Sequence, residues 1–223
     1  IFFLPLIFKV FLSATIGVIC GQEQMIDFIE NYYKTLSLLF NSIKVTDKDG
    51  DEIDFFRGIE NICSLIQLKA DSGGKLMFIG NGASASISSH MATDCWKNGG
   101  IRAVAFNDSS LLTCISNDYG YKHVFEKPIE MFADSGDILF AISSSGKSEN
   151  ILKGVHAAKS KECNVITLSG FKDDNPLSAT GDYNFYVPSQ EYGPVEIVHH
   201  SICHSILDAI ISHRRTQTNN GYQ

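Results

Sequence analysis

The stretch Asp137-Ile138-Leu139-Phe140-Ala141-Ile142-Ser143-Ser144-Ser145-Gly146-Lys147-Ser148 indicates both the fold class and the place where a ligand binds. It is a short apolar strand, followed by hydroxyls and a glycine that lead into a helical pattern near residues 148–161. A helix start offers free N–H groups and the positive end of the helix dipole, and the serines add further donors. We therefore expect this turn to bind a phosphate monoester. The alternative is an ordinary capping loop, although capping needs only one serine.

The sequence resembles two nucleotide-binding motifs but meets the full requirements of neither. The triplet Gly146-Lys147-Ser148 suggests a P-loop, but Ala141 stands where that motif has its first glycine. Gly80-Asn81-Gly82-Ala83-Ser84-Ala85 fits the dinucleotide fingerprint formally, yet Asp108 lies further on than the acidic residue at about 20 residues that the fingerprint expects. We expect no nucleotide cofactor. The glycines instead allow the backbone to approach a sugar, which the Asn81 amide and the Ser84 hydroxyl would contact.

Apolar runs and helical patterns alternate over most of the chain, which is typical of a parallel sheet covered on both faces. The predicted strands are Lys75–Ile79, Arg102–Phe106, Asp137–Ile142, Asn164–Leu168 and Asn184–Val187. We predict an α/β fold, a three-layer α/β/α sandwich of the flavodoxin-like type with a five-stranded parallel sheet. Two helices, Met25–Ser42 and about Asp54–Ala70, precede it, and a last helix spans about Val195–His213. Ligands of such sheets bind beyond the carboxyl ends of the strands.

The predicted organisation has four segments. Residues 1–24 are almost wholly apolar, and we expect the native protein to start at Met25, the first methionine; a signal sequence or membrane anchor is the alternative. We expect residues 25–72 to form a helical pair, residues 73–213 the ligand-binding domain and residues 214–223 a disordered tail. Within the pair, Thr46–Glu52 superficially resembles a calcium loop. Its spacing fails the EF-hand pattern, so we expect a solvated connection.

Composition restricts the class of protein and of partner. Of the 223 residues, 44% are hydrophobic and 19% charged, as in an ordinary globular protein. The net charge of −7 argues against a nucleic-acid partner, and we expect no membrane contact unless residues 1–24 are native. Six cysteines without any C-x-x-C spacing indicate reduced thiols in the cytoplasm. An anionic ligand must therefore be held by local donors.

Two predicted helices carry ionisable residues at helical spacing. These residues are His90 and Asp94 on the first, and Glu196, His199, His200, Cys203 and His204 on the last. We interpret His199, His200 and His213 as satisfied core or interface histidines. The remaining carboxylate–histidine set, beside a phosphate site, suits isomerisation through an enediol, in which one group removes a proton next to a carbonyl and another returns it to the neighbouring carbon. The same set can also hold zinc. Its members are His90, Asp94, Glu196 and His204.

The order of the motifs resembles that of the phosphoheptose isomerases, a branch of the SIS (sugar isomerase) domain superfamily. The motifs are Gly80–Ser84, the pair His90 and Asp94, Asn117–Gly120, Ile142–Ser148 and Val165–Leu168. The resemblance covers about Met25–His213 and implies an aldose–ketose isomerase that acts on sedoheptulose 7-phosphate. It also implies a homotetramer with sites built between subunits, and zinc in some members.

The resemblance assigns roles position by position. Together with Ser84, the implied substrate contacts are Asn81, Gly82, Ala83, Asn117, Asp118, Ser143, Ser144, Ser145, Ser148 and Glu196. The catalytic carboxylate is placed at Asp94 and the catalytic histidine at His204. The zinc ligands implied for some members are His90, Asp94, Glu196 and His204.

Three positions depart from the family pattern. Ala83 replaces a glycine, which is a mild change. Asp94 replaces a glutamate and is shorter by one methylene, about 1.5 Å, where a misplacement near 1 Å can cost about a hundredfold in rate. Glu196 replaces a glutamine and adds negative charge, which favours a metal or another cation nearby. Two function classes therefore remain open: a sugar-phosphate isomerase with Asp94 as base and His204 as acid/base, and a non-catalytic sugar-phosphate-binding or regulatory module of the replication-initiator-associated type.

Overall fold

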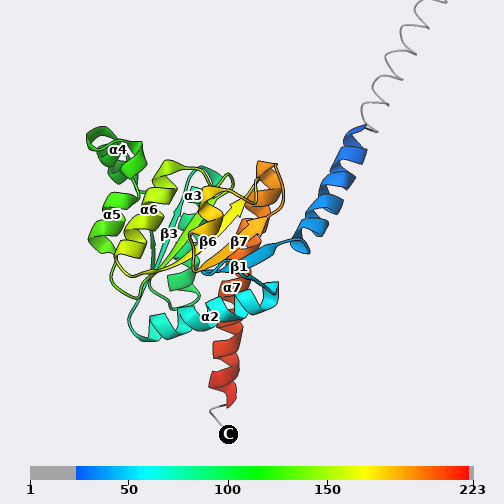
Figure 1. The fold of residues 1–223 in the computed structure, drawn as a ribbon. Coiled ribbons are helices and arrows are strands. Elements are labelled where there is room, and N and C mark those ends of the chain that lie inside the picture. Colours follow the sequence, from blue (N-terminus) through cyan, green and yellow to red (C-terminus); the bar gives the residue numbers. More distant parts are fainter. Residues whose placement is uncertain (1–23, 221–223) are drawn as a thin grey trace, which may run out of the picture. The chain divides into compact units, whose positions relative to one another are not determined.

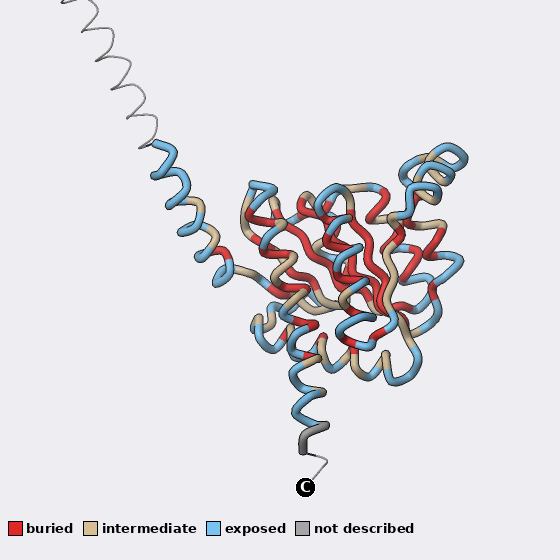
Figure 2. The backbone as a smooth tube through the Cα atoms, turned by 180° about the vertical axis from the view of Figure 1, so that it is seen from behind, coloured by how far each residue is buried: buried red, intermediate tan, exposed pale blue. Residues whose placement is uncertain are grey.

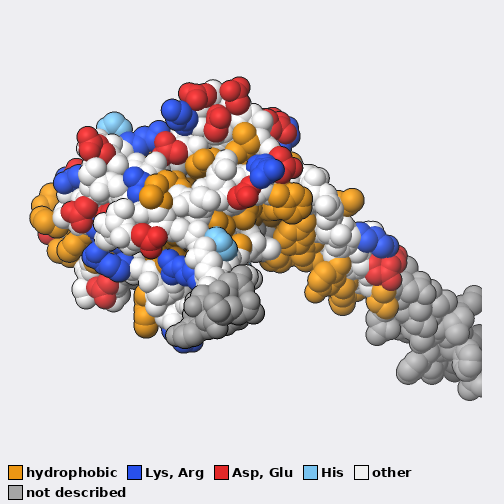
Figure 3. Space-filling view, turned by 90° about the horizontal axis from the view of Figure 1, so that it is seen from below, with side chains coloured by type: hydrophobic (Ala, Val, Ile, Leu, Met, Phe, Trp, Pro, Cys, Tyr) orange, Lys and Arg blue, Asp and Glu red, His pale blue; other side chains and the backbone are white. Residues whose placement is uncertain are grey.

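The computed structural model describes residues 24–220, which fall into two compact units that divide after Asn41. In the first unit, residues 24–40 form one helix on which hydrophobic side chains are exposed (Figure 3). The rest of the apolar segment that we expect to precede Met25 lies outside the described residues. None of the described helices combines the length and the hydropathy needed to cross a membrane.

The second unit is a three-layer α/β/α sandwich (Figure 1). In the described residues, seven strands form one sheet in the order β2-β1-β7-β6-β5-β3-β4. The parallel strands are β3 (Leu76–Gly80), β4 (Ala103–Ala105), β5 (Ile138–Ser143), β6 (Asn164–Gly170) and β7 (Tyr183–Val187). They coincide with the five predicted strands to within two residues at each end, and their order is that of a flavodoxin-like sheet.

Helices cover both faces of the sheet because residues along each buried strand alternate between them. Met77 and Ile79 pack into the cluster formed with α5 (Glu126–Phe132) and α6 (Glu149–Ser160), whereas Leu76 and Phe78 face α2 (Phe55–Asp71), α3 (Ala83–Lys97) and α7 (Tyr192–Asn220). The buried residues concentrate on the central strands (Figure 2). The remaining short elements are α4 (Ser109–Asp118), η1 (Tyr121–His123) and η2 (Pro176–Ala179).

We predicted a five-stranded sheet and, before it, a solvated loop. This prediction is wrong at one edge of the sheet. Residues of the predicted loop form β1 (Lys44–Asp47) and β2 (Glu52–Ile53), an antiparallel hairpin that extends the sheet beyond β7. The Asp47 carboxylate accepts hydrogen bonds from the backbone N–H groups of Asp49 and Asp51, so this acidic residue closes a turn. The polar sequence of β1 does not by itself predict a strand. It forms one here because the edge of β7 offers unpaired backbone N–H and C=O groups.

The last helix is longer than predicted. We expected it to end near His213 and residues 214–223 to be disordered, but α7 continues to Asn220. The Arg214 guanidinium donates a hydrogen bond to the carbonyl of Gly99, and the Thr216 hydroxyl bonds the Ser212 carbonyl one turn back. These contacts hold the helix beyond the predicted end.

One glycine fixes the shape of the serine-rich turn after β5. Gly146 has φ 62°, and a Cβ atom built on it would lie 1.8 Å from Oδ1 of Asn175. Asn175 is buried and bonds Ser169 and the carbonyl of Lys172. The turn therefore packs tightly on the residues that follow β6, and only glycine satisfies both the backbone angle and the space.

The substitution Gly146→Ala is expected to destabilise the protein more than Gly50→Ala. Both glycines have positive φ, which costs a residue with a Cβ about 1–2 kcal/mol, but the space around Gly50 is open. Displacing Asn175 adds about 1–3 kcal/mol for overpacking. Urea unfolding of the two variants measures the difference; equal losses would show that the contact with Asn175 carries no cost.

Candidate active site

The serine-rich turn presents hydroxyls at the carboxyl end of β5. Ser143 and Ser144 are buried, and Ser145 and Ser148 are half-buried. Ser148 is the N-cap residue of α6, but its side chain makes no capping hydrogen bond. A plain capping loop would use that hydroxyl for the helix. Its absence from the cap leaves the Ser148 hydroxyl available to a ligand at the positive end of the helix dipole.

The loop after β3 lies beside this turn. Gly82, with φ 57°, is the N-cap residue of α3, and no side chain caps the helix there. The Asn81 and Asn150 side-chain amides exchange two hydrogen bonds of 2.9 Å, and the Tyr121 hydroxyl donates to Oδ1 of Asn81 at 2.9 Å. These bonds join the loop after β3 to the first turn of α6. They therefore fix the loop after β3 relative to the serine-rich turn after β5.

The two loops and the start of α7 enclose a pocket of about 250 Å³. Its lining is rich in hydroxyls and small residues: Asn81, Gly82, Ala83, Ser84, Ile142, Ser143, Ser144, Ser145, Ser148, Tyr192 and Glu196. The pocket lies where the strand order reverses between β3 and β5, the position at which open α/β sheets bind ligands. Larger hollows of about 550 and 690 Å³ border α2 and the end of α7, away from the strand ends.

One carboxylate lines the hydroxyl pocket. Glu196 lies on the first turns of α7 and is half-buried, and desolvation by this burial raises the pKa of its carboxyl above the ordinary value. No basic side chain is among the residues that line the pocket. An anionic ligand there would be held by hydroxyls, backbone N–H groups and the dipoles of α3 and α6.

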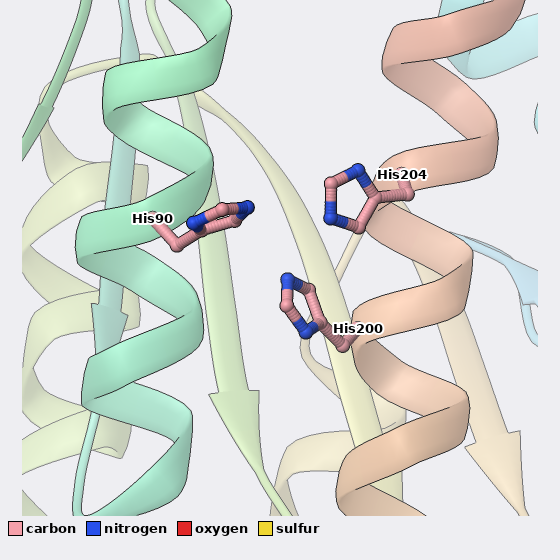
Figure 4. Close-up of side chains that lie close together, drawn as sticks. All are labelled: His90, His200 and His204. Carbon is pink, nitrogen blue, oxygen red and sulfur yellow. The ribbon is translucent and has the colours of Figure 1, made fainter.

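A cluster of three histidines lies further along α3 and α7, and we call it the histidine cluster. It consists of His90 on α3 and of His200 and His204 on α7, and one ring nitrogen from each lies within 4.8 Å of the others. Figure 4 shows the three rings facing one another between the two helices. Their ring centroids are 4.6 to 5.3 Å apart. Asp94 joins the cluster through Oδ2, 3.3 Å from Nε2 of His90.

His200 has an unusual environment for a histidine on a surface helix. Its Nε2 atom is buried and has no hydrogen-bond partner. Burial lowers the pKa of its imidazole, and the neighbouring His204 and His90 lower it further, against a smaller effect of Asp94. Within the described residues, His200 is therefore not a satisfied core histidine, and helical periodicity alone could not show which neighbours this ring meets.

The other candidate residues have separate places. His199 lies in the core, as expected: it is fully buried, Nε2 lies 3.0 Å from the Ser169 carbonyl oxygen, and burial lowers its pKa to about 4. Its Nδ1 atom has no hydrogen-bond partner among the described residues, so the ring is only half satisfied. His213 is exposed and borders a groove beside α2. Asn117 and Asp118 are exposed at the end of α4, where they bond each other at 2.8 Å, and they do not line the pocket.

The structure thus divides the predicted site residues into two neighbouring groups. The substrate contacts nominated in the two loops line the hydroxyl pocket together with Glu196. His90, Asp94 and His204 lie together at the histidine cluster, to which His200 is added. On α7, His200 is about 6 Å and His204 about 12 Å along the axis from Glu196, so the two groups follow each other along one side of this helix.

Known proteins are similar to this chain in sequence and in architecture. The profile of the SIS domain matches residues 52–170. Phosphoheptose isomerase from Helicobacter hepaticus is 36% identical over 160 residues, which are 69% of this chain and 81% of that protein. The structure of phosphoheptose isomerase GmhA from Neisseria gonorrhoeae is 33% identical with a TM-score of 0.65, over 69% of this chain and 86% of that one. A phosphoheptose isomerase structure from Francisella tularensis gives a TM-score of 0.72 at 26% identity, over 84% and 98%.

The profile match spans β3 to β6 and both loops that line the hydroxyl pocket, and the relatives named above cover 69% or more of the chain. On this basis, the chain belongs to the phosphoheptose isomerase family of SIS-domain proteins.

Proposed function

We propose that this protein is an aldose–ketose isomerase that acts on sedoheptulose 7-phosphate or a related sugar phosphate. The observation that carries the proposal is the hydroxyl pocket at the switch point of the sheet, with the Asp94 carboxylate and the histidine cluster further along the same two helices. The relatives named phosphoheptose isomerase support this substrate class. The fold by itself would not support a substrate class, because proteins that share one fold can have different functions.

The hydroxyl pocket positions the substrate. Its phosphate group lies against Ser143, Ser144, Ser145 and Ser148, at the start of α6, where charge-assisted hydrogen bonds compensate for the lack of a lining cation. The sugar then extends past Asn81 and Ser84 towards the histidine cluster. Holding the reacting carbons against fixed acid and base groups replaces an encounter in solution with a geometry close to that of reaction.

Asp94 and His204 carry the proton transfers. Asp94 takes the proton from the hydroxyl-bearing carbon next to the carbonyl, and the released electron pair forms the C=C bond of an enediol while the carbonyl oxygen gains a proton from His204. A proton is then returned to the former carbonyl carbon, and the other enediol hydroxyl loses its proton. The contact of Asp94 with His90 holds the carboxylate in place.

Zinc is part of the proposal. The ligands nominated from the sequence are His90, Asp94, Glu196 and His204; three of them lie together at the histidine cluster, whereas Glu196 lines the hydroxyl pocket. The donor set fits the metal, because imidazole nitrogens and a carboxylate come together from α3 and α7. When bound, zinc would polarise the carbonyl and hydroxyl oxygens of the sugar. The surrounding residues still have to bind the phosphate and move the protons.

The proposal includes a cytoplasmic homotetramer. Free thiols suit a reducing compartment: they are Cys63, Cys95, Cys114, Cys163 and Cys203. The helix over residues 24–40 exposes apolar side chains that association of subunits would cover, among them Ile26, Phe28 and Tyr33.

Removing pocket hydroxyls is expected to weaken substrate binding. Ser144→Ala and Ser148→Ala each lose a hydrogen bond to a charged phosphate, about 1.5–3 kcal/mol, so KM should rise by roughly 10- to 100-fold. Ser135→Ala is the matched control, because its hydroxyl lies before β5 and bonds Glu162. Kinetics in a coupled assay with sedoheptulose 7-phosphate measure the effect; a KM unchanged in both pocket variants would refute the phosphate site.

Lengthening the carboxylate at position 94 is expected to raise the rate. Asp94→Glu extends the reach by about one C–C bond length, 1.5 Å, and an isomerase with a short base should gain in kcat, whereas Asp94→Asn should remove turnover. The control is sugar-phosphate-dependent thermal stabilisation, which both variants should keep. Wild type that shows stabilisation but no turnover, with or without zinc, would indicate the non-catalytic binding module instead.

The apolar helix is expected to be needed for assembly. Light scattering on the purified chain should give the mass of four subunits, and the pair of changes Ile26→Asp and Phe28→Asp should reduce that mass without unfolding the α/β unit. The exposed Lys48→Asp serves as a charge-change control in the other unit. A monomeric wild type would contradict the tetramer.

A further inference from the structure

The histidine cluster contains one member that the family pattern did not nominate. His200 contributes a ring nitrogen within 4.8 Å of those of His90 and His204, whereas Glu196 lines the hydroxyl pocket. His200 and His204 are four residues apart on α7 and therefore project on the same side of the helix, towards His90 on α3 (Figure 4). The grouping thus comes from the packing of two helices.

The described residues provide no hydrogen-bond partner for one polar atom of this group. Nε2 of His200 is buried without a hydrogen bond, and such an atom costs about 1–3 kcal/mol relative to a satisfied one. A cation with vacant coordination positions satisfies all three lone pairs at once.

We propose that His90, His200 and His204 form a three-histidine zinc site in which His200, and not Glu196, is the third ligand from the protein. Tetrahedral Zn–N bonds place ligand nitrogens about 3.4 Å apart, so nitrogens already within 4.8 Å need only side-chain rotation to bind. The proposal rests on the proposed function for the role of the metal, but not for its ligands.

The surroundings of the cluster agree with this ligand set. Asp94, 3.3 Å from Nε2 of His90, is placed to orient that ring, as carboxylates beside ligating histidines do. Three protein ligands leave a fourth position open, which is the pattern of catalytic zinc sites, whereas four would close it. Glu196, about one helical turn before His200, lines the hydroxyl pocket instead.

The test compares His200→Leu with Glu196→Gln, and uses His213→Gln as a control on the same helix but outside the cluster. Zinc affinity is measured by competition with a chelating dye, and the number of imidazoles at the metal by X-ray absorption of the zinc-loaded full chain. His200→Leu should lower the affinity by more than the roughly 10- to 100-fold that loss of a ligand's hydrogen-bond partner costs. Glu196→Gln and His213→Gln should leave it unchanged, and wild type should show three imidazoles.

A second measurement separates ligation from a structural role. Without metal, His200→Leu should be as stable as wild type or more stable, because it replaces an unpaired buried nitrogen with an apolar group. Zinc should raise the unfolding temperature of wild type and not that of the variant. Loss of stability of the metal-free variant, or two imidazoles in wild type, would overturn the proposal.

The outcome is independent of turnover. Three imidazoles in a protein without isomerase activity would leave this zinc site standing and refute the proposed function. Turnover by a protein whose zinc is held by two imidazoles would support the proposed function and refute the three-histidine site.

Discussion

The hydrogen-bonded ladder between β3 and β5 is the constraint on which the site depends. It pairs Leu76 with Ile138 and continues to Gly80 and Ile142, so both strands end at the same level of the sheet. Their loops must then turn to opposite faces, one into α3 and the other into α6, and a space opens between them. The reciprocal amide bonds of Asn81 and Asn150 close this arrangement on the α6 side.

The parts of the fold that local sequence decides were predictable. The central strands are short and buried on both faces, which gives continuous apolar runs, and the glycines and serines after them cannot extend a strand into a core. The hairpin of β1 and β2 was not predictable in this way. Lys44–Asp47 carries charge and becomes a strand only because β7 offers an unpaired edge, and this is tertiary information.

The same limit explains the histidines of α7. Periodicity separates the stripe of Glu196, His200 and His204 from that of His199, but it does not say which stripe meets the core. In the structure, His199 packs against the sheet, whereas the side of α7 that carries Glu196, His200 and His204 faces α3. The adjacent residues His199 and His200 therefore lie in different environments. The pair His90 and Asp94 was predictable as a pair, because both lie on one helix at i,i+4, whereas its union with His200 required the packing of α3 against α7.

The charge of the pocket shows how an acidic chain can bind an anionic sugar. With a net charge of −7, long-range attraction works against a phosphate, so binding must come from short-range donors. The hydroxyls at the start of α6 supply them, and the Glu196 carboxylate in the same pocket opposes them while ionised. Burial raises the pKa of that carboxyl, which favours the neutral acid, a donor as well as an acceptor. A cation bound at the neighbouring histidine cluster would act the other way and stabilise the carboxylate. Metal and substrate would then be electrostatically coupled through the face of α7 that carries Glu196, His200 and His204.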